Sequence, residues 1–179
     1  MPKYVAFLRA INLGGHNIKM EVLRSLFEEM GLSNVETFIA SGNVIFEAAS
    51  ADAQELERKI TTALQAALGY AVAGFVRTTA ELTEIAAYQA IIDPGLDAGA
   101  STLYIAFLAR SPENQGLQKL LAQASEVNQF HANGREIYWL CRTRFSDSGF
   151  SGAQLEKALG MPTTIRNAST VKNIVQKYA

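Results

Sequence analysis

The clearest pattern in the chain is an apolar run over residues 4–11, in which Arg9 is the first charged residue. A run of this length without alternation predicts a central strand that is covered on both faces. Because successive side chains of a strand point to opposite faces, Arg9 should share a face with Val5, Phe7 and Ile11. An arginine among such neighbours needs a partner or an opening to solvent.

Helical and alternating patterns divide the rest of the first half into further elements. Apolar positions at helical spacing predict a helix over about residues 19–30, ended by Gly31. Residues 35–40 and 44–47 have strand composition, and Ser-Gly-Asn at 41–43 predicts a tight turn that joins them as a hairpin. Capping boxes at residues 52–55 and 78–81 predict two helix starts, with a strand over residues 70–77 between the helices.

The second half repeats this order of elements. The string YVAFL at residues 4–8 returns as YIAFL at 104–108, and residues 76–82 resemble residues 165–171. Such self-similarity predicts one structural unit used twice. Each half is predicted to be βαββαβ followed by a helix, which is the split βαβ or ferredoxin-like pattern. We therefore expect an α+β protein with two tandem ferredoxin-like halves, residues 1–95 and 100–179, each with an antiparallel sheet.

Composition narrows the class of protein. Hydrophobic residues make up 49% of the chain and charged residues 18%, which is typical of a folded globular protein. The net charge of −1 argues against a general nucleic-acid binder without excluding one. The first hundred residues are net negative and the rest net positive, so either the halves attract each other or the second half faces an anion. No basic and apolar leader or membrane-spanning run is evident, so a cytoplasmic protein without membrane contact is expected.

The first cluster of candidate site residues follows the opening strand and comprises Arg9, Asn12, Gly14, Gly15 and Lys19. Backbone N–H groups at a helix start, with two glycines that permit close approach, suit an anion, and Lys19 and Arg9 would add positive charge. The alternative is that the two glycines only form a tight turn.

Two further clusters lie in the predicted hairpin and near the end of the chain. Ser41 and Asn43 flank Gly42 in the hairpin, where turn geometry alone also explains them. Arg166, Asn167 and Thr170 lie at a strand end and helix start. Asn167 there suits a helix cap, whereas Arg166 is either a ligand clamp or an ion-pair partner.

Other chemistries find little support in the sequence. His16 and His131 have no cysteine or carboxylate at metal-ligand spacing, so we expect no metal site. No serine lies in a G-x-S-x-G elbow, and the basic-glycine-aromatic string of RNA-recognition folds is missing. The lone Cys141 lies in an apolar strand, where a small buried hydrophobe is the favoured interpretation. No cofactor and no catalytic residue is predicted, and whether the protein is an enzyme is left open.

Three motifs together resemble the DUF1697 family: R-x-I-N-x-G-G after the first strand, S-G-N-V at residues 41–44, and T-x-R-N-x-x-T at residues 164–170. The resemblance implies a mainly bacterial protein of unknown function with two α+β subdomains, or one compact domain over the whole chain. It lends no catalytic residue. The chain departs from the family pattern at Ala10, usually glycine, and at Ala168 and Ser169, usually tryptophan and asparagine.

The leading functional hypothesis is a non-catalytic binding module for a phosphate-bearing or other anionic small molecule. Arg9 and Arg166 would then converge at a cleft between the two halves. The first alternative is a structural or protein-interaction domain, in which the polar motifs cap helices and bridge the halves. The second is an enzyme of unidentified class, which would need an unusual arrangement of residues.

Overall fold

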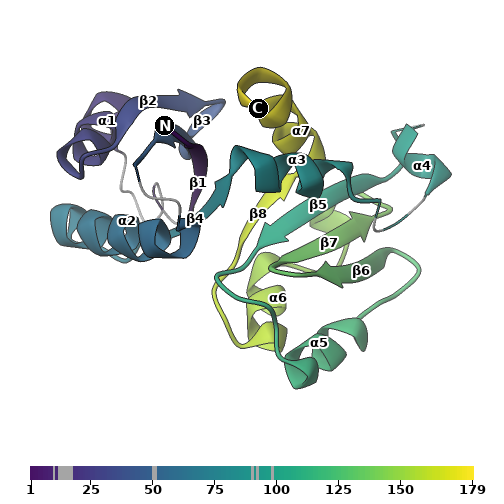
Figure 1. The fold of residues 1–179 in the computed structure, drawn as a ribbon. Helices are drawn as coiled ribbons and strands as arrows, with labels where there is room; N and C mark the ends of the chain where they lie inside the picture. Colours follow the sequence, from purple (N-terminus) through teal and green to yellow (C-terminus); the bar gives the residue numbers. More distant parts are fainter. Residues whose placement is uncertain (10, 12–17, 50–51, 90, 92, 98) are drawn as a thin grey trace. The chain divides into compact units, whose positions relative to one another are not determined.

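The computed structural model describes residues 1–179 apart from 10, 12–17, 50–51, 90, 92 and 98. Contacts divide the chain into two compact units, which are Met1–Leu82 with Tyr178–Ala179, and Thr83–Lys177. Each unit combines helices with a four-stranded antiparallel sheet (Figure 1). The α+β class is confirmed, and the two sheets agree with two similar halves. The predicted boundary between the halves at residues 95–100 stays a prediction.

The first unit contains a sheet in the order β2-β3-β1-β4. Its elements are β1 (Lys3–Arg9), α1 (Met20–Glu29), β2 (Ser33–Phe38), β3 (Ala40–Glu47), α2 (Ala53–Leu68), β4 (Ala73–Thr78) and the start of α3 (Thr79–Ala87). The capping boxes act as the sequence predicts. The Asp52 side chain accepts hydrogen bonds from two backbone N–H groups at the start of α2, and Thr78 and Glu81 exchange side-chain to backbone bonds at the start of α3.

Strand alternation divides β1 between two faces of this sheet. Tyr4, Ala6 and Leu8 join the buried cluster that contains Phe27 of α1 and Leu64 of α2. The alternate residues, including Arg9, point to the opposite face. The predicted central strand is therefore confirmed, with β3 and β4 paired on its two sides.

Tyr178 completes the first unit from far along the chain. Its hydroxyl donates to Glu36 Oε2 at 3.1 Å, and its ring meets Phe38 edge-on with centroids 5.9 Å apart. The Lys3 ammonium lies 6.0 Å from the centroid of the same ring. Glu36 lies opposite Ile45, which lies opposite Val5, so Glu36, Val5 and Lys3 share the sheet face that Tyr178 packs on.

The second unit has the strand order β6-β7-β5-β8. Its elements are α4 (Pro94–Asp97), β5 (Thr102–Phe107), α5 (Asn114–Leu121), β6 (Asn128–Asn133), β7 (Glu136–Cys141), a 3₁₀ turn (Phe145–Asp147), α6 (Gly152–Leu159), β8 (Thr164–Asn167) and most of α7 (Ala168–Tyr178). Helices α5 and α6 cover one face of the sheet (Figure 1). The core beneath them is rich in aromatic rings, with Trp139 between Tyr104 and Phe150.

The internal repeat extends to the strand register. Val5 of β1 pairs with Arg77 of β4, and Ile105 of β5 pairs with Arg166 of β8. In both arginines, Nη1 donates to the carbonyl of the preceding residue, at 2.9 Å for Arg77 and 3.0 Å for Arg166. Arg77 is 1% exposed and also forms an ion pair with Glu57 at 3.2 Å. Arg77 and Arg166 are therefore equivalent, as the resemblance of residues 76–82 to residues 165–171 predicts.

The predicted hairpin turn at residues 41–43 is wrong. These residues lie inside β3, and the chain reverses at Ile39, whose φ of 67° is unusual for a β-branched residue. The register explains the difference, because Phe7 pairs with Asn43 and Phe38 pairs with Ala40, which extends β3 back beyond the Ser-Gly-Asn motif. Tertiary pairing has overridden local turn composition here.

Candidate functional site

The structure describes only part of the first predicted cluster. Arg9 ends β1 and is half-buried, and Lys19 precedes α1 as an exposed residue that makes no side-chain cap. Asn12, Gly14 and Gly15 lie outside the described residues. An anion site in this loop therefore stays a prediction.

The second cluster lies at the same end of the first sheet as Arg9. Phe7, two residues before Arg9 on β1, pairs with Asn43. Asn43 is buried, and its Nδ2 donates to the Phe38 carbonyl at 3.0 Å. This bond ties β2 to β3, which gives Asn43 a local structural role.

The third cluster lies where β8 passes into α7. Arg166 Nη1 donates to Thr164 Oγ1 at 2.7 Å, and burial lowers the pKa of the Arg166 guanidinium to about 10. Asn167 Oδ1 accepts from the backbone N–H of Ser169 at 2.9 Å, as expected of a helix cap, and Thr170 lies in the first turn of α7. The convergence of this cluster with Arg9 at one cleft stays a prediction.

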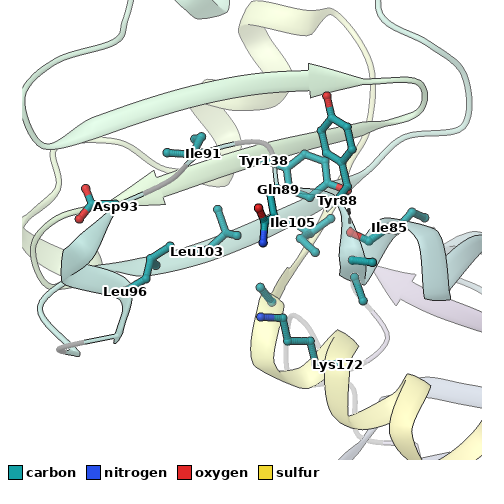
Figure 2. Close-up of a pocket in the computed structure, with 13 residues that line it drawn as sticks. Ile85, Tyr88, Gln89, Ile91, Asp93, Leu96, Leu103, Ile105, Tyr138 and Lys172 are labelled. Carbon is teal, nitrogen blue, oxygen red and sulfur yellow. Dashed lines mark hydrogen bonds between the residues drawn. The ribbon is translucent and has the colours of Figure 1, made fainter.

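A pocket of ≈ 400 Å³ lies beside this third cluster, within the second unit (Figure 2). Its floor is the sheet face opposite the aromatic core, and its described walls come from α3, from α7 and from Tyr88, Gln89, Ile91, Asp93 and Leu96. The described lining residues are Ile85, Ala86, Ala87, Tyr88, Gln89, Ile91, Asp93, Leu96, Leu103, Ile105, Tyr138, Ala168 and Lys172.

Strand alternation and one buried hydrogen bond position these walls. Tyr104 and Trp139 face α5 and α6, so Leu103, Ile105 and Tyr138 must point to the other face. Tyr138 is 1% exposed, and its hydroxyl donates to the carbonyl of Ile85 at 2.8 Å, which anchors the end of α3 on the sheet. Burial raises the pKa of the Tyr138 phenol far above its ordinary value, so the phenol stays protonated.

Tyr88 holds the chain where it leaves α3. Its ring centroid lies 5.4 Å from that of Tyr138 and 5.8 Å from that of His131. The Tyr88 hydroxyl is 3.0 Å from His131 Nε2, within hydrogen-bond distance. Tyr88 therefore joins the wall of the pocket to β6 and β7.

Two charged side chains line the pocket, and their surroundings differ. Asp93 accepts from the Gly95 backbone N–H and from Arg142 Nε, both at 2.7 Å. The Gly95 bond, followed by the Arg142 bond, lowers the pKa of the Asp93 carboxyl below its usual value. Lys172 is exposed, and within the described part of the chain its ammonium makes no hydrogen bond or ion pair. Its position one turn after Ala168 places both residues on one face of α7.

Sequence reasoning missed the residues that form this pocket. Val171 belongs to the apolar stripe of α7, and Lys172 is the next residue, outside that stripe. By this pattern Lys172 is an ordinary solvent-exposed lysine. The net positive charge of the second half was a weak signal toward an anion. Gln89 and Tyr138 carried no motif, because their proximity to Lys172 arises only from the packing of α3 and α7 on the sheet.

Within the described residues no helix is long and apolar enough to cross a membrane. Among the same residues, no three histidine, cysteine, aspartate or glutamate side chains are grouped so that they could hold a metal ion.

Comparison with known proteins identifies a family and a shared fold. A family model described as "Protein of unknown function (DUF1697)" matches residues 1–138. The solved structure of the conserved bacterial protein SP0830 from Streptococcus pneumoniae superposes with a TM-score of 0.70 at 22% sequence identity, covering 99% of this chain and 98% of the other. That likeness shows a shared fold. No curated protein matches the chain.

Proposed function

Since the chain belongs to the DUF1697 family, whose function is unknown, we propose a function from the molecule itself: it is a non-catalytic module that binds a small anionic molecule. The proposed location is the pocket of the second unit, beside Arg166 and Asn167. A cleft that Arg9 and Arg166 share remains the alternative location.

One observation carries this proposal. The pocket combines a volume of ≈ 400 Å³ with an ammonium, that of Lys172, which has no partner among the described residues. Ligand pockets have volumes of about 300–1,000 Å³, and a few polar groups in an apolar lining orient the ligand. The pocket also includes Ala168 at the start of α7, where the helix dipole is positive.

The chemistry of the lining supports binding rather than catalysis. Among the described lining residues, the one carboxylate, Asp93, is engaged by Arg142 and by a backbone N–H. The Tyr138 hydroxyl is committed to a backbone carbonyl. The described lining contains no serine, cysteine or histidine that would serve as a nucleophile or a base at neutral pH.

The strand order of each sheet supports a further part of the proposal. We infer that each half has the ferredoxin-like arrangement, because both sheets place the strands in the same order and every pair is antiparallel. In such a fold one sheet face is covered by the two connecting helices, which leaves the other face available for a ligand.

A thermal-shift screen with matched lysine variants tests the proposed function. The probes are inorganic phosphate, nucleotides, sugar phosphates, short RNA and organic carboxylates. A ligand at a hundred times its dissociation constant adds about 2.7 kcal/mol, which for a chain of this size raises Tm by about 5–10 °C. We expect one class of anion to raise Tm in the wild type and in Lys157→Met, an exposed lysine on α6, but not in Lys172→Met.

Two results contradict the proposal. If no anion raises Tm, the pocket is not an anion site. If an anion raises Tm equally in Lys172→Met but not in Arg9→Ala, the ligand binds at the first predicted cluster instead. A much less stable Arg9→Ala with no ligand effect would favour the structural alternative.

A further inference from the structure

We propose that the ligand of this pocket is a hydroxylated monocarboxylate, such as a sugar acid. Its carboxylate would lie at the α7 end, against Lys172, and its hydroxyl groups would face Gln89 and Asp93. This inference rests on the proposed function and specifies its ligand.

The surface that the lining offers sets the character of the ligand's body. Ile85, Ile105 and Tyr138 belong to the lining but are buried, so their side chains offer a ligand almost no surface. Gln89 and Lys172 are exposed, and the surface that the described lining presents is more polar than apolar. The pocket is also half open to solvent. A hydroxylated body keeps part of its hydration at the open side and exchanges the rest for hydrogen bonds to the wall, whereas an apolar body would bury little apolar surface.

Two side chains of the lining can pair with hydroxyl groups. The Gln89 amide offers donors and an acceptor, and its side chain makes no hydrogen bond to another described residue. The Asp93 carboxylate accepts two hydrogen bonds, from the Gly95 N–H and from Arg142, whereas an ionised carboxylate can accept about four. Because Arg142 already balances its charge, Asp93 favours a neutral O–H donor over a second cation.

The available cation sets the head group. Lys172 is the one charged donor in the described lining, which contains no arginine. A phosphate monoester carries about −1.5 to −2 charges and three strong acceptor oxygens, which arginine forks or several donors usually bind. One ammonium matches the single charge of a carboxylate.

The positions of these side chains set the orientation and the length of the ligand. Figure 2 shows Asp93 and Lys172 toward different ends of the lining, with Gln89 between them. A carboxylate is attracted to Lys172 and repelled by Asp93, so the hydroxyl groups extend from Gln89 toward Asp93. At about 30 Å³ per water, ≈ 400 Å³ corresponds to about 13 water molecules, so a sugar acid of about six carbons fits.

Isothermal titration calorimetry on the full chain tests this inference. The probes are gluconate, hexanoate, sorbitol, glucose 6-phosphate and inorganic phosphate. Gluconate and hexanoate share their chain length and carboxylate and differ in hydroxyl groups, whereas sorbitol has the hydroxyl groups without the charge.

The expected order of affinity follows from the worth of each hydrogen bond. Gluconate should bind roughly tenfold more tightly than hexanoate, because each net bond with Gln89 or Asp93 is worth a factor of about 2–12. Gluconate should bind at least about tenfold more tightly than sorbitol, because a hydrogen bond to a charged group is worth about tenfold or more. Glucose 6-phosphate and inorganic phosphate should bind more weakly than gluconate.

Two variants with matched controls assign the binding to the pocket. Lys172→Met should remove the preference for gluconate over sorbitol, whereas Lys157→Met should keep it. Gln89→Met should weaken gluconate by about 2–12-fold and leave hexanoate within about twofold, whereas Gln118→Met, on α5, should change neither. All four residues are exposed, so the variants should fold normally.

The outcomes separate the inference from the proposed function. If hexanoate binds as tightly as gluconate and depends on Lys172, the ligand is not recognised by its hydroxyl groups, so the inference is wrong and the anion site stands. If a phosphate compound binds more tightly than gluconate and depends on Lys172, the carboxylate is the wrong head group and the anion site again stands. If gluconate binds equally well to the wild type and Lys172→Met, the inference is also wrong, because the acid then binds without its proposed counter-charge. If none of the probes binds, both proposals fail.

Discussion

Replacing Gly116 by alanine should destabilise the protein, although the same substitution inside a helix usually stabilises one. Gly116 lies inside α5, where replacing a glycine by alanine ordinarily stabilises a helix by about 1 kcal/mol. Here an added Cβ would lie 3.1 Å from the carbonyl oxygen of Leu159 and 3.3 Å from its Cα, on α6. Both neighbours are backbone atoms, so the two helices must separate to admit the methyl group.

The expected magnitude follows from these two opposing effects. Overpacking a well-packed contact costs about 1–3 kcal/mol, and the gain in helix propensity offsets about 1 kcal/mol of it. Gly116→Ala should therefore lower the free energy of unfolding by about 0–2 kcal/mol. Gly152→Ala, at the start of α6, is the matched control, because its nearest neighbour is the flexible end of Ile165 at 3.4 Å. That control should leave stability unchanged or slightly raised.

Urea denaturation of the wild type and the two variants measures the effect. Gly116→Ala should lower the midpoint without changing the slope m, since the surface exposed on unfolding stays the same. A Gly116→Ala variant as stable as Gly152→Ala would refute the close packing of α5 on α6 as the reason for glycine at this position.

Three further predictions concern buried or charged pairs. Glu57→Gln should lower the free energy of unfolding by about 3 kcal/mol in urea, because it removes the charge that faces the buried Arg77. Asn128→Ala should cost about 1–3 kcal/mol, because its Oδ1 accepts from the buried indole N–H of Trp139; the fluorescence of this single tryptophan reports unfolding. The pKa of the Asp93 carboxyl is lower in the folded protein than in the unfolded chain, so its ionised form stabilises the fold at pH values above the ordinary carboxyl pKa. This stabilisation is lost as the pH falls through the pKa of the folded state. The Tm of Asp93→Asn should therefore depend less on pH below about 4 than that of the wild type, and equal pH profiles would contradict this.

The sequence predicted the helices and strands more reliably than the pairing and packing between them. The apolar run of β1 predicted a central strand from local pattern alone, and its echo predicted the strand β5; both lie inside their sheets. The hairpin turn was wrong because Ser-Gly-Asn suits a turn by composition, while the register of β3 against β1 placed the reversal at Ile39. Sheet pairing is a non-local interaction, which a local pattern cannot supply.

In the candidate site, too, local features could be predicted and non-local contacts could not. Asn167 was recognised as a helix cap because its bond to Ser169 is local. Lys172 was missed because the pocket around it forms only when residues of α3 and α7 meet on one sheet face. Asn43 had the composition of a site residue, yet its amide ties two strands together. A polar residue near a predicted turn can therefore serve the pairing of two strands, as Asn43 does.

The position of Tyr178 has a consequence for synthesis on the ribosome. Domains generally fold from the N-terminus as the chain emerges, at about 5–20 residues per second. The partner of Glu36 and Phe38 is made only after Thr83–Lys177, so β2 waits about 5–20 s at these rates for the side chain that covers it. Transiently exposed apolar surface promotes aggregation. The nascent first unit thus passes through a period in which the Phe38 ring lacks its partner and is accessible to chaperones, and that period ends after residue 178 leaves the exit tunnel.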